Sequence, residues 1–165
     1  MPAKQPRPLD AIDVKILAAL QSDGRMTIQK LAGAVGLSAR PCLERVRRLQ
    51  STGIIVGYQA ILDPRQLARS ITILAEIALK TQAGRTIFER RLKAIDEAVE
   101  CWEISGPSDY IARFVCSDLG RYEALTAELL GDPVLGIDRI VSHVALRPVK
   151  RFEGYPASLL APRAV

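Results

Sequence analysis

Apolar residues in the first third of the chain recur at intervals of three or four, the spacing that places side chains on one face of an α-helix. The pattern predicts a first helix over residues 9–21, in which Asp10 is the N-cap and Asp13 places negative charge near the positive end of the helix dipole. Two more helices follow after short breaks. Thr27 is expected to cap the second helix and Ser38 the third.

The third expected helix has one apolar and one basic face. Its polar face carries Arg40, Glu44, Arg48 and Ser51, flanked by Arg45 and Arg47. A face of this width and charge fits the major groove of DNA, with its basic edges against phosphates. It also fits a plain solvated surface, because Arg40/Glu44 and Glu44/Arg48 have the i, i+4 spacing of ion pairs.

The distribution of charge favours DNA over the plain solvated surface. The chain carries a formal net charge of +5. Residues 1–70 hold 11 Lys and Arg against 5 Asp and Glu, whereas residues 71–165 hold 12 against 13. Neutralising phosphates supplies most nonspecific affinity for DNA, so a basic N-terminal module joined to a neutral one predicts double-stranded DNA as a partner. The helix-turn-helix is expected over about 28–47, and the expected contacts come from it and from residues next to it: Thr27, Ser38, Arg40, Glu44, Arg45, Arg47, Arg48 and Ser51.

The segments around this module have simpler signals. Residues 54–62 are mostly apolar and predict two short strands broken near Gly57, which would make residues 9–63 a winged helix-turn-helix. Residues 64–70 are expected to be a linker. The first eight residues have charge and proline but no apolar core of a signal peptide, so they are expected to form a flexible arm, and residues 151–165 a C-terminal tail.

From residue 71 onward the pattern changes to alternating strands and helices, which predicts an α+β protein overall. The expected order is a strand over 71–79, a helix with Phe88, Leu92 and Ile95 on one face, strands over 99–104 and 110–116, a helix capped by Asp118 with Tyr122, Leu125 and Leu129 inside, and a strand over 137–146. This βαββαβ order gives an antiparallel sheet with helices on one side. The other face needs a cover, and a partner subunit is the natural one.

Catalytic, metal-binding and membrane motifs are missing from the sequence. Cys42, Cys101 and Cys116 form no CxxC pair, and each is expected to be a small, reduced core residue. The phosphate-binding and nucleophile-elbow glycine motifs do not occur, and no apolar stretch approaches the roughly 20 residues of a membrane span. We therefore expect no enzyme, no metal, no cofactor and no membrane association, and a cytoplasmic, nucleoid-associated location. An enzyme of similar fold is the weakest alternative, because no nucleophile and base pair supports it.

Two segments carry a resemblance to a known family. LDAIDVKILAALQSDGR and LAGAVGLSARPCLERVRRLQSTGIIVGYQAILDP closely resemble the leucine-responsive regulatory protein and AsnC family, the feast/famine regulators. The resemblance is dense over residues 9–64 and looser to about residue 150. It implies a DNA-binding helix-turn-helix followed by a ferredoxin-like effector-binding and oligomerisation domain over 71–150, in dimers that assemble further, commonly into octamers. The implied function is a sequence-specific transcriptional regulator that responds to an amino acid or its metabolite; an architectural DNA-binding protein without an effector is the alternative.

The resemblance also implies an effector site. The turn Ser105, Gly106, Pro107, Ser108, Asp109, Tyr110 is similar to the family's GxxD turn, and Ser142 matches a position near the ligand where the family often has threonine. Backbone N–H groups near Gly106 could hold a carboxylate, and Asp109 could receive an ammonium group. The same residue types also suit an ordinary hairpin turn.

Two residues near this site have open roles. Trp102 is either an interface anchor, which we favour, or a wall of the effector pocket. His143 has no acidic partner evident in the sequence, so we expect a satisfied or exposed histidine and no general base.

Overall fold

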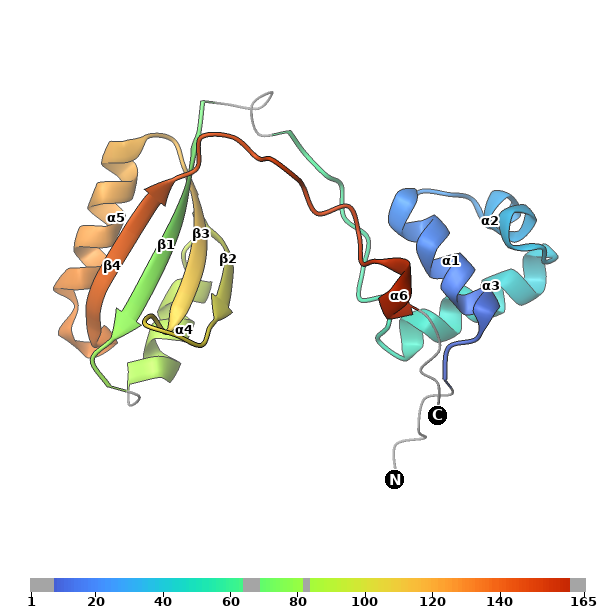
Figure 1. Cartoon of the computed structure of the whole chain (residues 1–165), viewed down its shortest axis with the longest axis horizontal. Helices are drawn as coiled ribbons and strands as arrows, with labels where there is room; N and C mark the ends of the chain where they lie inside the picture. The colour runs from blue at the N-terminus through green and yellow to red at the C-terminus, as the bar shows by residue number, and fades with distance from the viewer. Residues whose placement is uncertain (1–7, 64–68, 82–83, 161–165) are drawn as a thin grey trace. The chain divides into compact units, whose positions relative to one another are not determined.

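A computed structural model describes residues 8–63, 69–81 and 84–160 of the 165-residue chain. The chain forms two compact units, one of residues 1–61 with 150–165 and the other of residues 62–149 (Figure 1). Most of the expected arm, most of the linker and the last five residues of the tail lie outside the described residues.

The first unit contains the three predicted helices: α1 (Ala11–Ser22), α2 (Ile28–Val35) and α3 (Ala39–Ser51). The predicted N-cap at Asp10 is confirmed. Its carboxylate accepts hydrogen bonds from the backbone N–H groups of Ile12 (3.0 Å) and Asp13 (2.9 Å), and the Asp13 carboxylate accepts one from the Asp10 N–H (3.1 Å). This reciprocal pair is a capping box, which satisfies donors that the first turn leaves open.

The turn between α2 and α3 is formed as predicted, with one difference. Thr27 caps α2 through a hydrogen bond from the Lys30 N–H (3.3 Å), and Gly36 ends the helix at a φ of 75°, a left-handed conformation that favours glycine. Ser38 occupies the N-cap position of α3, but its side chain accepts no capping hydrogen bond. The reason is local: an N-cap side chain commonly bonds the N–H of the third helical residue, which here is Pro41 and has none.

Small apolar side chains from all three helices form the core of this unit. Its fully buried members are Ile16, Leu31, Cys42 and Leu49, with Leu17, Ala32, Val35 and Val46 nearly so. The helices therefore bury the stripes that their spacing predicts.

The two strands expected over 54–62 are not formed. Residues 54–63 have no strand assignment, and Val56 and Ile61 are 94% and 82% exposed. An isolated pair of short strands is marginally stable in water, and only Ile55 of this segment packs partly against the helical core. The two predicted strands therefore lack a surface of the described unit that would cover them.

The end of the chain packs on α1 instead of extending as a free tail. Gln21 donates its side-chain Nε2 to the carbonyl of Tyr155 (3.3 Å) and accepts the Tyr155 N–H at Oε1 (2.6 Å). A short helix, α6 (Ala157–Leu160), follows, and Leu160 packs against the helical core. The described part of residues 151–165 is thus a component of the first unit.

The second unit has the predicted βαββαβ order. Its elements are β1 (Ile71–Leu79), α4 (Arg85–Lys93), β2 (Ala98–Glu103), β3 (Tyr110–Cys116), α5 (Leu119–Gly131) and β4 (Ile137–Val144), with a 3₁₀ turn, Pro133–Leu135, before the last strand. The strands form one antiparallel sheet in the order β2-β3-β1-β4. Figure 1 shows α4 and α5 on the same side of this sheet. The N-cap at Asp118 is confirmed by a hydrogen bond from the Arg121 N–H (2.8 Å).

The helices cover one face of the sheet and leave the other open, as predicted. The covered face buries alternate residues of the central strands, among them Ile73, Ile77, Ala112 and Phe114. Ile95 is buried too, but just after the end of α4. On the open face, Trp102 and Val141 are 48% and 41% exposed. Cover by a partner subunit stays a prediction.

Candidate DNA-binding surface and effector site

The exposed face of α3 carries half of the residues expected to contact DNA. Arg40 and Glu44 form an ion pair (3.3 Å) with side chains 90% and 64% exposed. Arg47 and Ser51 are exposed as well, and all four lie on one side of the helix because their numbers advance by three or four. We refer to Arg40, Glu44, Arg47 and Ser51 as the open face of α3. Thr27 and Ser38, the two expected residues at the helix starts, are also exposed.

Arg45 and Arg48 point instead toward the start of α1. Arg45 donates to the carboxylates of Asp10 (2.6 Å) and Asp13 (2.8 Å), and Arg48 donates to Asp13 (2.5 Å). Asp13 is fully buried, whereas the two arginine side chains are 24% and 30% exposed. The hydrogen bond from Arg45 is the main cause that lowers the pKa of Asp10 to about 2.

This arrangement changes the expectation for these two arginines. A buried carboxylate needs charged partners, because an unpaired charge away from water is costly. Arg45 and Arg48 supply them and join α3 to α1. Contact of either with DNA stays a prediction, and their first partners are Asp10 and Asp13.

The turn expected to hold an effector connects β2 and β3. Gly106 has a φ of 132°, which favours glycine. The Asp109 carboxylate accepts hydrogen bonds from the Leu79 N–H (2.8 Å) and from an Arg85 NH₂ group (3.0 Å), and Arg85 also forms an ion pair with Glu103. Both oxygens of Asp109 therefore already hold the end of β1 and the start of α4.

The other expected effector residues lie in two places. Ser108 is buried with its hydroxyl 3.4 Å from the Glu76 carboxylate, and the Pro107 carbonyl accepts a hydrogen bond from Arg139 (2.8 Å). Ser105 is exposed. Ser142 lies on the helix-covered face of β4, where its hydroxyl is 2.6 Å from that of Tyr122. The structure thus gathers residues 105–109 in one loop, with Tyr110 at the start of β3, and places Ser142 on β4.

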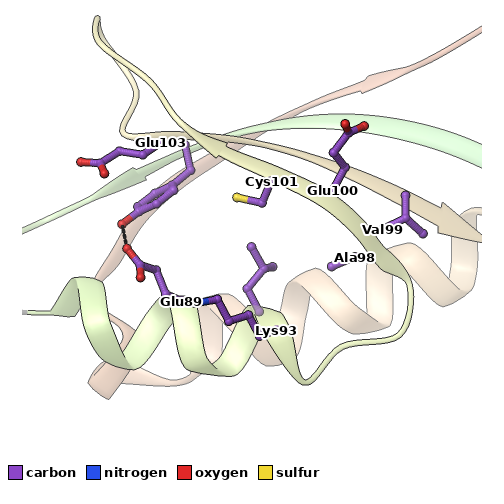
Figure 2. Close-up of a pocket in the computed structure, with 9 residues that line it drawn as sticks. Glu89, Lys93, Ala98, Val99, Glu100, Cys101 and Glu103 are labelled. Atoms are coloured by element: carbon purple, nitrogen blue, oxygen red, sulfur yellow. Dashed lines mark hydrogen bonds between the residues drawn. The ribbon is translucent and has the colours of Figure 1, made fainter. Parts of the chain in front are cut away.

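Tyr110 connects the turn to a groove that sequence reasoning missed. Its ring is buried and lines a cavity of about 340 Å³ between α4 and β2 (Figure 2). The Tyr110 hydroxyl donates to the Glu89 carboxylate (3.0 Å). Burial, and then this contact with Glu89, raises the pKa of Tyr110 to about 12.

Three further expectations can be compared with the structure. Cys42 and Cys116 are buried as predicted, but Cys101 is exposed on the edge strand β2, so its assignment to the core is wrong. Trp102 lies on the open face of the sheet. His143 has an acidic neighbour after all, because its Nε2 is 3.4 Å from the Glu76 carboxylate.

Metal binding and membrane crossing find no support among the residues that the structure describes. Among the described residues, no three His, Cys, Asp or Glu side chains are grouped as metal ligands. No helix in the same residues is long and apolar enough to cross a membrane.

Two family models match the chain, and together they cover most of both units. Residues 9–50 match an AsnC-type helix-turn-helix domain. Residues 72–155 match an Lrp/AsnC ligand binding domain.

Characterised relatives and solved structures agree with these matches. The chain is 36% identical to the leucine-responsive regulatory protein of Haemophilus influenzae, over 92% of each chain, and 38% identical to the Bkd operon transcriptional regulator of Pseudomonas aeruginosa, over 86% of this chain and 93% of the relative. A Neisseria meningitidis transcriptional regulator in complex with L-methionine is similar, with a TM-score of 0.85 and 27% identity over 93% of this chain and 99% of the other. An AsnC family regulator from Agrobacterium tumefaciens has a TM-score of 0.84 and 28% identity over 93% and 100%.

Proposed function

The chain belongs to the Lrp/AsnC family of transcriptional regulators, and on that premise we propose that the open face of α3 contacts promoter DNA and that an amino acid modulates this contact. The protein is a DNA-binding transcriptional regulator with a ligand-binding domain. We further propose that it acts on the nucleoid without catalytic activity and without a cofactor. Its relatives are transcriptional regulators.

One observation carries the DNA-binding part of the proposal. Arg40 and Arg47 project from the helix after the tight turn, whereas Arg45 and Arg48 are held by carboxylates. The ion pair of Arg40 with Glu44 is exposed and hence weak, so Arg40 can exchange it for a phosphate or a guanine edge.

The test compares variants on a selected duplex. A binding sequence is first selected from a random duplex pool, and affinities are then measured by fluorescence anisotropy at several salt concentrations. Arg47→Ala and Arg40→Ala should each weaken binding by about 1–3 kcal/mol if the side chain contacts a base, or lower the salt slope by about 1 if it contacts a phosphate. The control is Arg90→Ala, which removes an exposed arginine from α4 in the other unit. Equal, small effects in all three variants would refute the proposed surface.

The selection also separates this function from that of an architectural protein. A regulator should enrich one sequence that binds at least about 1,000-fold more tightly than random duplex. An architectural protein without base readout would show strong, salt-dependent binding and no enriched sequence. The latter outcome would favour the architectural alternative.

An amino-acid effector is supported by the match to a ligand-binding domain and by the L-methionine complex of the Neisseria regulator. Thermal unfolding of the second unit can be followed through the fluorescence of Trp102, the single tryptophan. A ligand at 100 times its dissociation constant should stabilise the unit by about 2.7 kcal/mol. If none of the natural amino acids changes either unfolding or DNA affinity, the effector part of the proposal fails.

The open sheet face supports assembly through a second copy of the chain. It carries apolar side chains, Trp102 and Val141, together with the ion pair Glu100–Arg113 (2.9 Å) and the neighbouring side chains of Glu76 and His143. We propose dimers through this face and octamers built from them. Analytical ultracentrifugation tests the count. A monomer at micromolar concentration would refute the dimer, and a dimer that assembles no further would refute the octamer.

A further inference from the structure

The chain crosses between its two units twice. Residues up to 61 belong to the first unit, residues 62–149 form the second unit, and residues 150–165 belong to the first unit again. One connection follows residue 61 and leads to β1, and the other leaves β4 and leads to the C-terminal segment, by which we mean residues 150–160. The DNA-binding unit is therefore attached to the second unit at two points of the chain.

The second attachment depends on how the first unit holds the C-terminal segment. Gln21, near the end of α1, directs both hydrogen bonds of its side-chain amide to the backbone of Tyr155, at 3.3 Å to the carbonyl and 2.6 Å from the N–H. A residue in an antiparallel sheet exchanges the same two bonds with its partner. The contact therefore fixes the backbone at Tyr155, and it does not need the Tyr155 side chain, which is 63% exposed.

The residue before Tyr155 has to be a glycine for this contact to form. Gly154 has a φ of 124°, and a Cβ at this position would lie 2.8 Å from Oε1 and 2.9 Å from Cδ of Gln21. Both the backbone conformation and the close approach disfavour any side chain here. Gln21 and Gly154 thus serve one contact, although they lie at opposite ends of the chain.

The remainder of the segment adds one apolar anchor. The short helix α6 lies beside α1 (Figure 1), and Leu160 is half-buried against the helical core. The buried residues of that core that the structure describes come from α1, α2 and α3. A substitution that releases the segment therefore leaves the buried core of the DNA-binding unit in place.

Either connection alone would leave the DNA-binding unit with a long tether. Residues 62–70 separate residue 61 from β1, and residues 145–154 separate β4 from Tyr155. Chains of these lengths span at most about 30–36 Å. One tether limits only the distance of the unit, whereas two tethers at different points also limit its rotation.

From this arrangement we infer that the C-terminal segment, held by Gln21, makes the protein selective for the spacing between paired DNA half-sites. The inference rests on the proposed function, because it requires two copies of the chain on one duplex. A symmetric dimer binds half-sites about one helical turn, or a multiple of it, apart. A unit with restricted rotation meets the second half-site only at a matching spacing, whereas a unit on one flexible tether accepts many. Gln21 and Gly154 are thus positioning residues that act through the segment.

The test measures affinity against half-site spacing by fluorescence anisotropy. One duplex carries the paired half-sites selected from the random pool, a second lengthens their spacer by about 5 base pairs, or half a helical turn, and a third carries a single half-site. The full-length variants are Gln21→Ala and Gly154→Ala. The matched control is Gly131→Ala, the same change as Gly154→Ala at the end of α5, where an added Cβ has no atom within 4 Å.

The wild type and Gly131→Ala should bind the selected spacing at least about 10-fold more tightly than the lengthened one, because losing the second half-site removes the gain from bivalent binding. In Gln21→Ala and Gly154→Ala this ratio should fall below about 3-fold, since a single tether lets the unit reach both spacings. Affinity for the single half-site should stay unchanged in all variants. That last result distinguishes a positioning role from damage to the DNA-binding unit itself.

Three results would overturn the inference and leave the proposed function intact. The first is a wild-type ratio in both Gln21→Ala and Gly154→Ala, and the second is an equal loss of affinity by these variants for the single and the paired half-sites. The third is a wild-type protein that binds both spacings equally. A wild-type protein that binds none of the three duplexes would overturn the proposed function as well.

Discussion

The buried carboxylate of Asp13 should be the most sensitive point of the DNA-binding unit. Asp13→Asn keeps the size of the side chain and removes the charge that Arg45 and Arg48 contact at 2.8 and 2.5 Å. It leaves two guanidinium groups facing a neutral amide, with only Asp10 still paired to Arg45.

The expected loss follows from the burial of the three groups. Breaking a buried ion pair from one side costs about 3–5 kcal/mol. The arginine side chains here remain 24% and 30% exposed, so water replaces part of the lost interaction, and we expect about 2–3 kcal/mol. For a unit of this size, that loss lowers the unfolding midpoint by on the order of 10–20 °C.

The two units can be followed separately in one melting experiment. The three helices of the first unit contribute most of the helical signal in circular dichroism, whereas Trp102, the single tryptophan, lies in the second unit. Asp13→Asn should lower the midpoint seen by circular dichroism and leave the transition seen by tryptophan fluorescence in place.

The matched control is Glu44→Gln, the same chemical change in an exposed pair. Its partner Arg40 is 90% exposed, and such pairs contribute about 0–1 kcal/mol. The structural role of Asp13 would be refuted if the unfolding midpoint of Asp13→Asn lay within about 3 °C of that of Glu44→Gln, because about 3 °C corresponds to less than 1 kcal/mol.

Three further predictions address other contacts. In the folded unit the pKa of Asp10 is lowered from 3.8 to about 2, so the ionised Asp10 carboxylate stabilises the first unit at neutral pH. This stabilisation is lost as the pH falls from about 4 to about 2. The free energy of unfolding measured with urea should therefore fall more over that pH range in the wild type than in Asp10→Asn. Equal falls in the two proteins would contradict this role of Asp10. Ser142→Ala leaves the buried Tyr122 hydroxyl unpaired and should destabilise the second unit by about 1–2 kcal/mol, measured through the tryptophan transition. A loss of stability in the first unit instead would be inconsistent with the position of Ser142 in the second unit. Gln21→Ala and Gly154→Ala should both speed hydrogen exchange of residues 153–160. Gly154→Ala acts here because Gly154 has a φ of 124° and an added Cβ would lie 2.8 Å from Gln21 Oε1. Unchanged exchange in both variants would show that this segment does not depend on Gln21.

Local periodicity was enough to predict most of the fold. The helix caps at Asp10, Thr27 and Asp118 are confirmed because a capping residue needs only its own neighbours. The strands of the second unit are also recovered, since their alternation is imposed by the covered face of the sheet.

The failures share a dependence on partners distant in sequence. Residues 54–62 form no strand, because an apolar run does not specify the surface that would cover it. The groove between α4 and β2 brings Glu89 of α4 beside Tyr110 of β3, a contact that becomes apparent only once the strand order is known. Residue type alone predicts a core position for Cys101, but its side chain is exposed because it lies on the edge strand β2.

The sequence did contain a signal for the split among the arginines of α3. Asp13 shares the apolar stripe of α1 with Ile16 and Leu17, and an acid on a buried stripe requires a cationic partner. Arg45 and Arg48 are those partners, so they determine where α3 lies, while Arg40 and Arg47 lie on the open face of α3, which we propose contacts DNA. The two roles differ in their salt dependence. Arg47→Ala removes a positive charge and should flatten the salt slope of DNA binding, whereas Asp13→Asn disturbs the helix that presents this charge and should weaken binding with a slope unchanged or steeper.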